Sequence, residues 1–122
     1  MLENLIGAQL VSIDDINIKV KLDGKLYNLE IYSDDGDCCG YAEFTTHLLY
    51  SEDDYRNPII TNIELVSNSN GDGMTSVLTF YGENKELAKV ESEAGSGSGW
   101  GYGSYVNIRC KMLGIDDELA SW

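Results

Sequence analysis

The chain has 122 residues, of which 43% are hydrophobic, and this length suits a single domain with its own core. Its 21 acidic and 8 basic residues give a formal net charge of −13. Because attraction to nucleic acid polymers and anionic membranes depends on clustered Lys and Arg, this charge excludes non-specific binding to either.

The sequence has none of the features of a secreted or membrane protein. No apolar run is long enough to cross a bilayer, and residues 1–7 lack the basic start of a signal peptide. The cysteines are odd in number, and the adjacent Cys38 and Cys39 cannot easily bridge to each other, which is typical of a reducing compartment. We therefore expect a soluble cytoplasmic protein.

Alternation of hydrophobic and polar residues predicts strands in the first third of the chain. These strands are expected at 9–13, 16–22, 26–32 and 41–44. Asp23 and Gly24 favour a two-residue turn, so that the second and third strands should pair as an antiparallel hairpin. Residues 45–50 instead favour a short helix capped by Thr45.

The Asn57-Pro58 pair breaks regular structure, because a residue before proline prefers extended geometry. Further strands are expected at 59–66, 75–81, 86–92 and 105–109. A polar loop over 67–73 joins the first two of them, and residues 115–122 favour a short amphipathic helix. The prediction is a mainly β fold: an antiparallel meander, a curled sheet or a sandwich of about seven strands with one or two short helices.

In residues 95–103 every second residue is a glycine, and Ser, Trp and Tyr residues lie between the glycines. Glycine lets the main chain approach a ligand and offer its N–H groups to phosphate oxygens, a role we assign to Gly99 and Gly101. Trp100 and Tyr102 supply ring faces on which a base can stack. A second interpretation is a flexible hairpin loop whose rings cover the end of a sheet.

The sequence holds little of what catalysis requires. It has no Walker-type phosphate loop, no dinucleotide-binding glycine pattern between strand and helix, and no nucleophile elbow. His47, the single histidine, is either an activating base for Cys39 or a lone surface residue, with Cys38 and Cys39 a buried pair at a strand end. No zinc-ligand spacing occurs. We expect no enzyme activity, no metal and no cofactor.

Two arginines, Arg56 and Arg109, are the only guanidinium groups in this acidic chain. Either they pair with local carboxylates, or they meet a phosphate through two hydrogen bonds each. The residues themselves leave both interpretations open.

Several short motifs together resemble a known family. The resemblance is carried by Leu5–Gly7, Asp37–Cys39 with Tyr41 and Ala42, Asn57–Ile60, Val77–Tyr81 and Gly99–Tyr105. On these motifs, which are spread over most of the chain, the sequence resembles the phage Thoeris anti-defence proteins, within a broader family of small phage and bacterial β proteins.

The resemblance implies a function. Proteins of this kind bind a cyclic ADP-ribose isomer made by a TIR-domain sensor and hold it without cleaving it. The signal then cannot activate the anti-phage defence of the bacterium. It implies that the whole of 1–122 is one ligand-binding β domain that acts in the cytoplasm of the infected bacterial host. The partner is then a small cyclic nucleotide, with no DNA or RNA polymer and no membrane.

Such a ligand carries a purine, which calls for stacking, and a pyrophosphate, which calls for cations or N–H donors. From the residues we expect the rings of Phe80 or Tyr81, Trp100 and Tyr102 to stack, Arg56 and Arg109 to neutralise the pyrophosphate, Asn84 or Asn107 to bind a ribose hydroxyl or base edge, and Gly99 and Gly101 to offer backbone N–H groups. For Phe80 the alternative is a place in the core, as is usual for a ring on an alternating strand.

A protein that sequesters a scarce signal has to bind it tightly, with a binding free energy on the order of −10 to −12 kcal/mol. Sites between subunits enclose a ligand better than a surface loop does, so we expect a homo-oligomer whose contact includes residues 115–122. Two alternatives remain: an acidic protein that blocks a basic or nucleic-acid-binding host factor, and a small hydrolase or lyase that destroys the signal.

Overall fold

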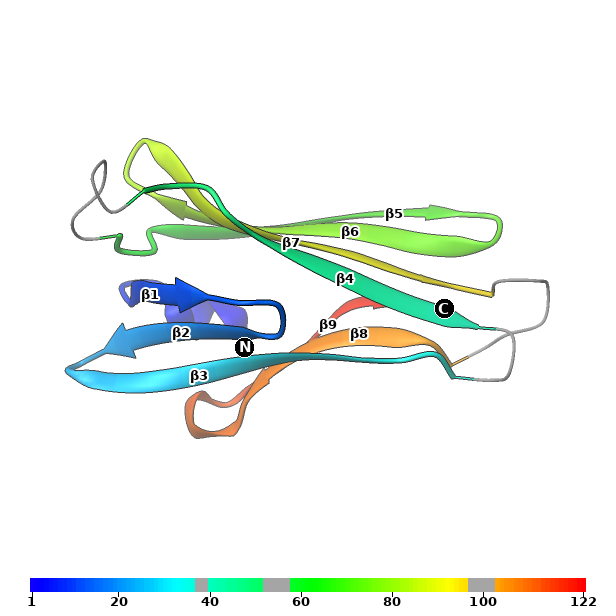
Figure 1. The fold of residues 1–122 in the computed structure, drawn as a ribbon, viewed down its shortest axis with the longest axis horizontal. Helices are drawn as coiled ribbons and strands as arrows, with labels where there is room; N and C mark the ends of the chain where they lie inside the picture. The colour runs from blue at the N-terminus through cyan, green and yellow to red at the C-terminus, as the bar shows by residue number, and fades with distance from the viewer. Residues whose placement is uncertain (37–39, 52–57, 97–102) are drawn as a thin grey trace.

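Two antiparallel β-sheets lie face to face in the computed structural model (Figure 1). The structure describes residues 1–36, 40–51, 58–96 and 103–122, with only the backbone of Asn70. A five-stranded sheet has the order β1-β2-β3-β8-β9, and a four-stranded sheet has the order β4-β7-β6-β5. The predicted mainly β sandwich is thus confirmed.

The described residues form two short 3₁₀ helices and nine strands. Their bounds are η1 Leu2–Leu5, β1 Gln9–Ile13, β2 Asn17–Leu22, β3 Lys25–Asp34, β4 Tyr41–Leu48, β5 Asn62–Asn70, β6 Gly73–Gly82, β7 Lys85–Gly95, β8 Tyr105–Cys110, η2 Lys111–Leu113 and β9 Ile115–Ser121. Among the described residues, no helix is both long and apolar enough to span a membrane.

The five-stranded sheet begins with the hairpin that the sequence predicts. Asp23 and Gly24 have φ values of 52° and 81°, as a tight two-residue turn between β2 and β3 requires. On its other side β3 pairs with β8, which places Ile31 opposite Ile108 although 77 positions separate them in the chain (108 − 31). The same pairing brings Glu30 and Tyr32 of β3 opposite Arg109 and Asn107 of β8.

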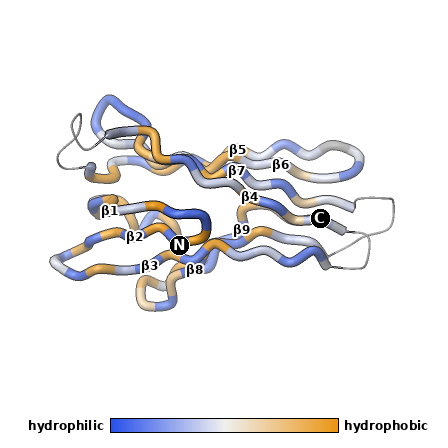
Figure 2. The backbone as a smooth tube through the Cα atoms, viewed as in Figure 1, coloured by the Kyte–Doolittle hydropathy of each residue, from blue (hydrophilic) through white to orange (hydrophobic). Residues whose placement is uncertain are grey.

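The core forms where the inner faces of the two sheets meet. Successive side chains of a strand point to opposite faces of its sheet, so every second side chain points into the core. Figure 2 shows the corresponding alternation of hydropathy along strands such as β2 and β3. The largest fully buried side chains are Phe80, Leu5, Leu10, Ile18, Leu29, Ile31, Ile60, Leu78, Leu87, Ile108, Ile115 and Leu119. Both sheets contribute to this one cluster.

Both predicted helices are wrong. Residues 45–48 belong to β4, where Thr45 and Thr46 are β-branched residues that suit a strand and pair with β7. Residues 115–121 form β9, with Ile115 and Leu119 buried in the core. Residues four apart share a face in a strand as well as in a helix, so their spacing does not separate the two structures.

The main apolar side chains of the C-terminal segment face inward. Ile115, Leu119 and Ala120 are buried in the core of their own chain, so these side chains offer no free apolar surface to another subunit. The predicted polar loop over 67–73 is also wrong in extent, because β5 and β6 extend through it and only Gly71 and Asp72 form the turn.

Gly95 at the end of β7 is needed for close packing. A Cβ at this position would lie 2.6 Å from the ring of Tyr41, which pairs with Gly95 across the strands. We expect Gly95→Ala to lower the free energy of unfolding by about 1–3 kcal/mol, as overpacking does. The same change at Gly71, where a Cβ meets nothing within 4 Å, is expected to have a much smaller effect.

Urea denaturation of the single variants and of Gly95→Ala in a Tyr41→Ala background measures this effect. If the ring is the obstacle, the loss caused by Gly95→Ala largely disappears once the ring is gone. An equal loss in both backgrounds contradicts the steric explanation.

Candidate functional site

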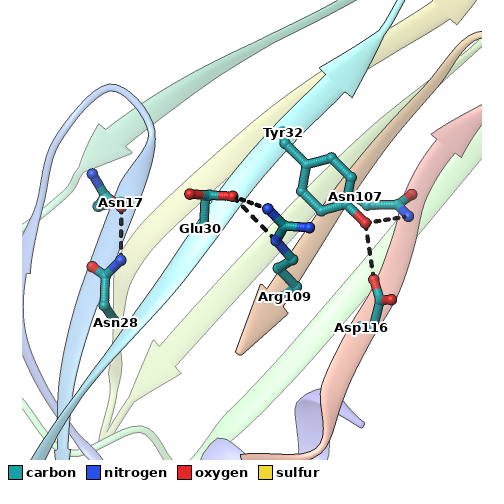
Figure 3. A network of polar contacts seen from close by, with 7 residues as sticks. All are labelled: Asn17, Asn28, Glu30, Tyr32, Asn107, Arg109 and Asp116. Carbon is teal, nitrogen blue, oxygen red and sulfur yellow. Dashed lines mark hydrogen bonds and ion pairs between the residues drawn. The ribbon is translucent and has the colours of Figure 1, made fainter. Parts of the chain in front are cut away.

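A polar cluster lies on the outer face of the five-stranded sheet. Along β8, the side chains of Val106, Ile108 and Cys110 turn into the core, while Asn107 and Arg109 turn outward. Register pairs each outward residue of β8 with an outward residue of β3. The β3–β8 cluster, as we call it, consists of Glu30, Tyr32, Asn107, Arg109 and the β9 residue Asp116, which are drawn in Figure 3, together with Tyr105.

Arg109 lies over an aromatic ring within this cluster. Its Cζ is 4.4 Å from the centroid of the Tyr32 ring, which is cation–π geometry. Its Nη2 and Nε donate hydrogen bonds of 2.6 and 3.1 Å to one oxygen, Oε1 of Glu30. The hydrogen bond to Glu30 is the main cause that raises the pKa of Arg109 above its ordinary value, so the guanidinium stays charged.

Tyr32 connects the remaining members of the cluster. Its hydroxyl donates to Oδ1 of Asp116 at 3.1 Å and accepts from Nδ2 of Asn107 at 3.2 Å. Its ring meets that of Tyr105 edge to face, with 6.0 Å between centroids. The two tyrosines thereby fix the plane against which Arg109 rests.

Two groups of the cluster have unused hydrogen-bonding capacity. Among the described residues, Nη1 of Arg109 makes no hydrogen bond, and the buried Oδ1 of Asn107 has no partner. A buried acceptor without a donor is costly, so Oδ1 would gain a hydrogen bond if a movement of the side chain exposed it to a donor. The cluster therefore combines a cation, a flat ring and a buried, unpaired amide acceptor.

A shallow hollow of about 280 Å³ adjoins Arg109. It is lined by Asn28, Glu30, Arg109, Cys110 and Lys111. Lys111 brings a second cation beside the guanidinium, whereas Glu30 competes with any anion for it. Sequence reasoning missed both Tyr32 and Lys111. The alternation in residues 26–32 indicates that Tyr32 points outward, but it does not indicate which residue lies opposite Tyr32 on the neighbouring strand.

Two other predicted residues meet on the four-stranded sheet. Tyr81 and Asn84 line a hollow of about 470 Å³ with Thr61, Asn62, Glu64, Gly82, Lys85 and Glu86. Asn84 holds a left-handed conformation, φ 62°, in the turn between β6 and β7. Arg109 and Asn107 belong to the other sheet, so the described predicted residues form two groups and not one.

The remaining predicted site residues divide into one that is buried and five that are not described. The side chain of Phe80 is 0% exposed and packs in the core, which leaves Tyr81 as the ring of this pair that a ligand can reach. Five predicted residues lie outside the described part of the chain: Arg56, Gly99, Trp100, Gly101 and Tyr102.

The residues that flank 97–102 meet those that flank 37–39 at one end of the sandwich (Figure 1). A Cβ on Gly40 would lie 3.4 Å from the carbonyl oxygen of Gly95, and one on Gly103 would lie 4.0 Å from Cα of Gly36. The hydroxyl of Ser104 donates to the same Gly95 oxygen at 3.3 Å. β8 then begins at Tyr105, so the chain passes directly from this glycine-rich end into the cluster.

The outer face of the four-stranded sheet is acidic. Glu43, Glu91 and Glu93 line a hollow of about 250 Å³, and the Tyr41 hydroxyl donates to Glu93 at 3.1 Å. Burial, followed by this hydrogen bond, raises the pKa of Tyr41. In the described segments no three His, Cys, Asp or Glu side chains are placed to hold a metal ion. His47 lies 3.7 Å from Glu91, and its suggested partner Cys39 is not described.

Comparisons with protein-family models, with curated proteins and with solved structures gave no match. The chemistry of the β3–β8 cluster is therefore the basis for a functional proposal.

Proposed function

We propose that this protein binds a cyclic ADP-ribose-type nucleotide made by a TIR-domain sensor and sequesters it without cleaving it. In this role it is a phage-encoded inhibitor of bacterial anti-phage defence in the cytoplasm of the infected host. The observation that best supports the proposal is the stacking of Arg109 on Tyr32 next to the unpartnered Oδ1 of Asn107. The resemblance of the sequence to Thoeris anti-defence proteins supports it independently.

Each feature of the cluster suits one part of such a ligand. The free edge of the Arg109 guanidinium and the ammonium of Lys111 suit the two charges of a pyrophosphate. The amide oxygen of Asn107, which a movement of the side chain would have to expose, suits a ribose hydroxyl or the amino group of a purine. The glycine-rich segment that precedes β8 brings rings and backbone N–H groups in sequence next to these side chains.

Binding without cleavage agrees with the state of the two carboxylates in the cluster. Glu30 accepts two hydrogen bonds from Arg109, and Asp116 accepts one from Tyr32. Both carboxylates are therefore already engaged in orienting Arg109 and Tyr32.

The proposal includes a homo-oligomer with its ligand sites at or near subunit interfaces. A hollow of about 280 Å³ on an open sheet face encloses little of a ligand with two ribose units and a purine. A neighbouring subunit would exclude water from the remaining surface of the ligand, as tight binding requires.

Isothermal titration calorimetry and native mass spectrometry against a panel of ligands test the proposal. The panel contains cyclic ADP-ribose isomers together with cyclic di- and trinucleotides. We expect at least one cyclic ADP-ribose isomer to bind with a dissociation constant in roughly the nanomolar range, near −12 kcal/mol. If no member of the panel produces heat or a bound mass, the proposed function is wrong.

A second candidate function follows from the acidic hollow at Glu43, Glu91 and Glu93. This surface suits a basic or nucleic-acid-binding host protein, which the chain would block by occupying its phosphate-binding surface. Capture of such a partner should weaken steeply with salt, because exposed charges are screened. Binding of the cyclic nucleotide changes much less with added salt if stacking contributes much of its free energy.

A further inference from the structure

In the described part of the chain, three of the four edge strands each have at least one feature that opposes pairing with another chain. At β1, the N–H of Leu10 donates to the carbonyl of Pro58 at 2.8 Å. At β4, the N–H of Ala42 donates to the Asp35 carboxylate at 3.0 Å. β9 carries three successive acidic residues at 116–118, and charge on an edge strand opposes pairing with another chain.

The fourth edge, β5, is open. Within the described part of the chain, the hydrogen bonds of β5 are those of its ladder with β6, and it leaves its other side unpaired. Leu65 and Val66 in the middle of the strand are 41% and 47% exposed. A long, unprotected edge with exposed apolar residues at its centre is a template for a further strand.

The hairpin geometry shows which backbone groups face this open side. Gly71 and Asp72 form a two-residue turn, so Asn70 and Gly73 exchange hydrogen bonds, and so does every second pair along the ladder. The N–H and C=O groups of the alternate residues therefore point away from β6; these residues are Ile63, Leu65, Ser67 and Ser69.

The low charge of β5 permits a second copy to pair with this edge. The chain carries a net charge of −13, so two copies repel each other wherever their acidic surfaces meet. β5 has a single charged residue, Glu64, in nine positions. Two copies can thus approach along β5 with less repulsion than along the acidic edge of β9.

We propose that β5 pairs with β5 of a second copy, antiparallel and centred on Val66, so that two four-stranded sheets become one continuous sheet. This register places each Glu64 opposite an Asn68, which keeps the two carboxylates from facing each other. It also places Asn68 of the second copy beside the hollow at Tyr81 and Asn84, since Glu64 lines that hollow. The dimer does not depend on the proposed ligand.

Sedimentation and light scattering measure the oligomeric state. The wild type is expected to have twice the chain mass of 13.5 kDa at micromolar concentration. Val66→Glu places like charges opposite each other at the centre of the seam and should give the mass of a single chain. Leu26→Glu, the same charge change at an exposed leucine of β3, should leave the dimer intact.

A second variant separates loss of pairing from loss of folding. Ser67→Pro removes an N–H that faces the open edge and leaves the β5–β6 ladder intact, as is tolerated on edge strands. It should therefore give a monomer with unchanged circular dichroism. A monomeric wild type overturns the proposal, and the open edge of β5 would then be expected to pair with a strand of another protein. A dimer that survives both Val66→Glu and Ser67→Pro overturns it as well.

Disulfide trapping tests the register. At a centre on Val66 the two copies of this residue form a pair without hydrogen bonds, with Cα atoms about 4.5 Å apart, and a disulfide spans this distance. Val66→Cys should therefore give a covalent dimer on oxidation, at a level well above that of Leu26→Cys and the parent protein. Equal yields overturn the proposed pairing. If the dimer forms but calorimetry detects no nucleotide, only the proposed function is wrong.

Discussion

Replacing Arg109 with alanine is expected to weaken binding of the matching cyclic ADP-ribose isomer by about 10- to 100-fold, the usual effect of losing hydrogen bonds to a charged group. The guanidinium is the cation that the structure holds against the Tyr32 ring, and its Nη1 edge remains free for a phosphate. The melting temperature should change little, because exposed ion pairs contribute little to stability. Calorimetry and thermal denaturation of the same preparations separate the two effects.

Glu30→Gln is the matched control for this prediction. It removes the carboxylate that competes for Arg109, so ligand affinity should rise while the fold is unchanged. If Arg109 served only to pair with Glu30, both variants would leave ligand affinity unaltered. Arg109→Lys should fall between wild type and alanine, because it keeps the charge but loses the planar, two-point geometry.

Replacing Phe80 with alanine is expected to have the largest effect on stability of the substitutions considered. Its ring is fully buried between the sheets, and removing a buried Phe typically lowers the free energy of unfolding by about 3–5 kcal/mol. Tyr81→Ala, which removes the neighbouring ring at the surface, should cause a clearly smaller loss. Urea denaturation at neutral pH measures both.

Phe80→Leu distinguishes a core residue from a ligand contact. Leucine fills much of the space, so the folded protein should retain wild-type affinity for the nucleotide. A folded Phe80→Leu variant with greatly weakened ligand binding would contradict the placement of this ring in the core.

Much of the fold could be predicted from local sequence. Alternation located eight of the strands, and Asp23 with Gly24 specified the first hairpin because both adopt positive φ. The errors at 45–50 and 115–122 have one physical source. Short segments with weak local preference take the structure that their neighbours impose, and here those neighbours are β7 and β8.

The candidate site was predictable only within single strands. Asn107 and Arg109 are two positions apart on a predicted strand, so their common face follows from the sequence. Their partners Tyr32 and Glu30 depend on the register between β3 and β8, which no local pattern specifies. For the same reason the sequence does not show that Tyr81 and Asn84 belong to the other sheet.

Capture and release of the ligand tests the central claim most directly. The protein is mixed with the isomer that binds it, unbound ligand is removed by ultrafiltration, and the retained complex is heated and analysed by mass spectrometry. Our account predicts that the filter retains the isomer, that heating releases it chemically unchanged, and that Arg109→Ala retains far less. A cleaved product after heating, or an isomer that passes the filter freely, would contradict the account.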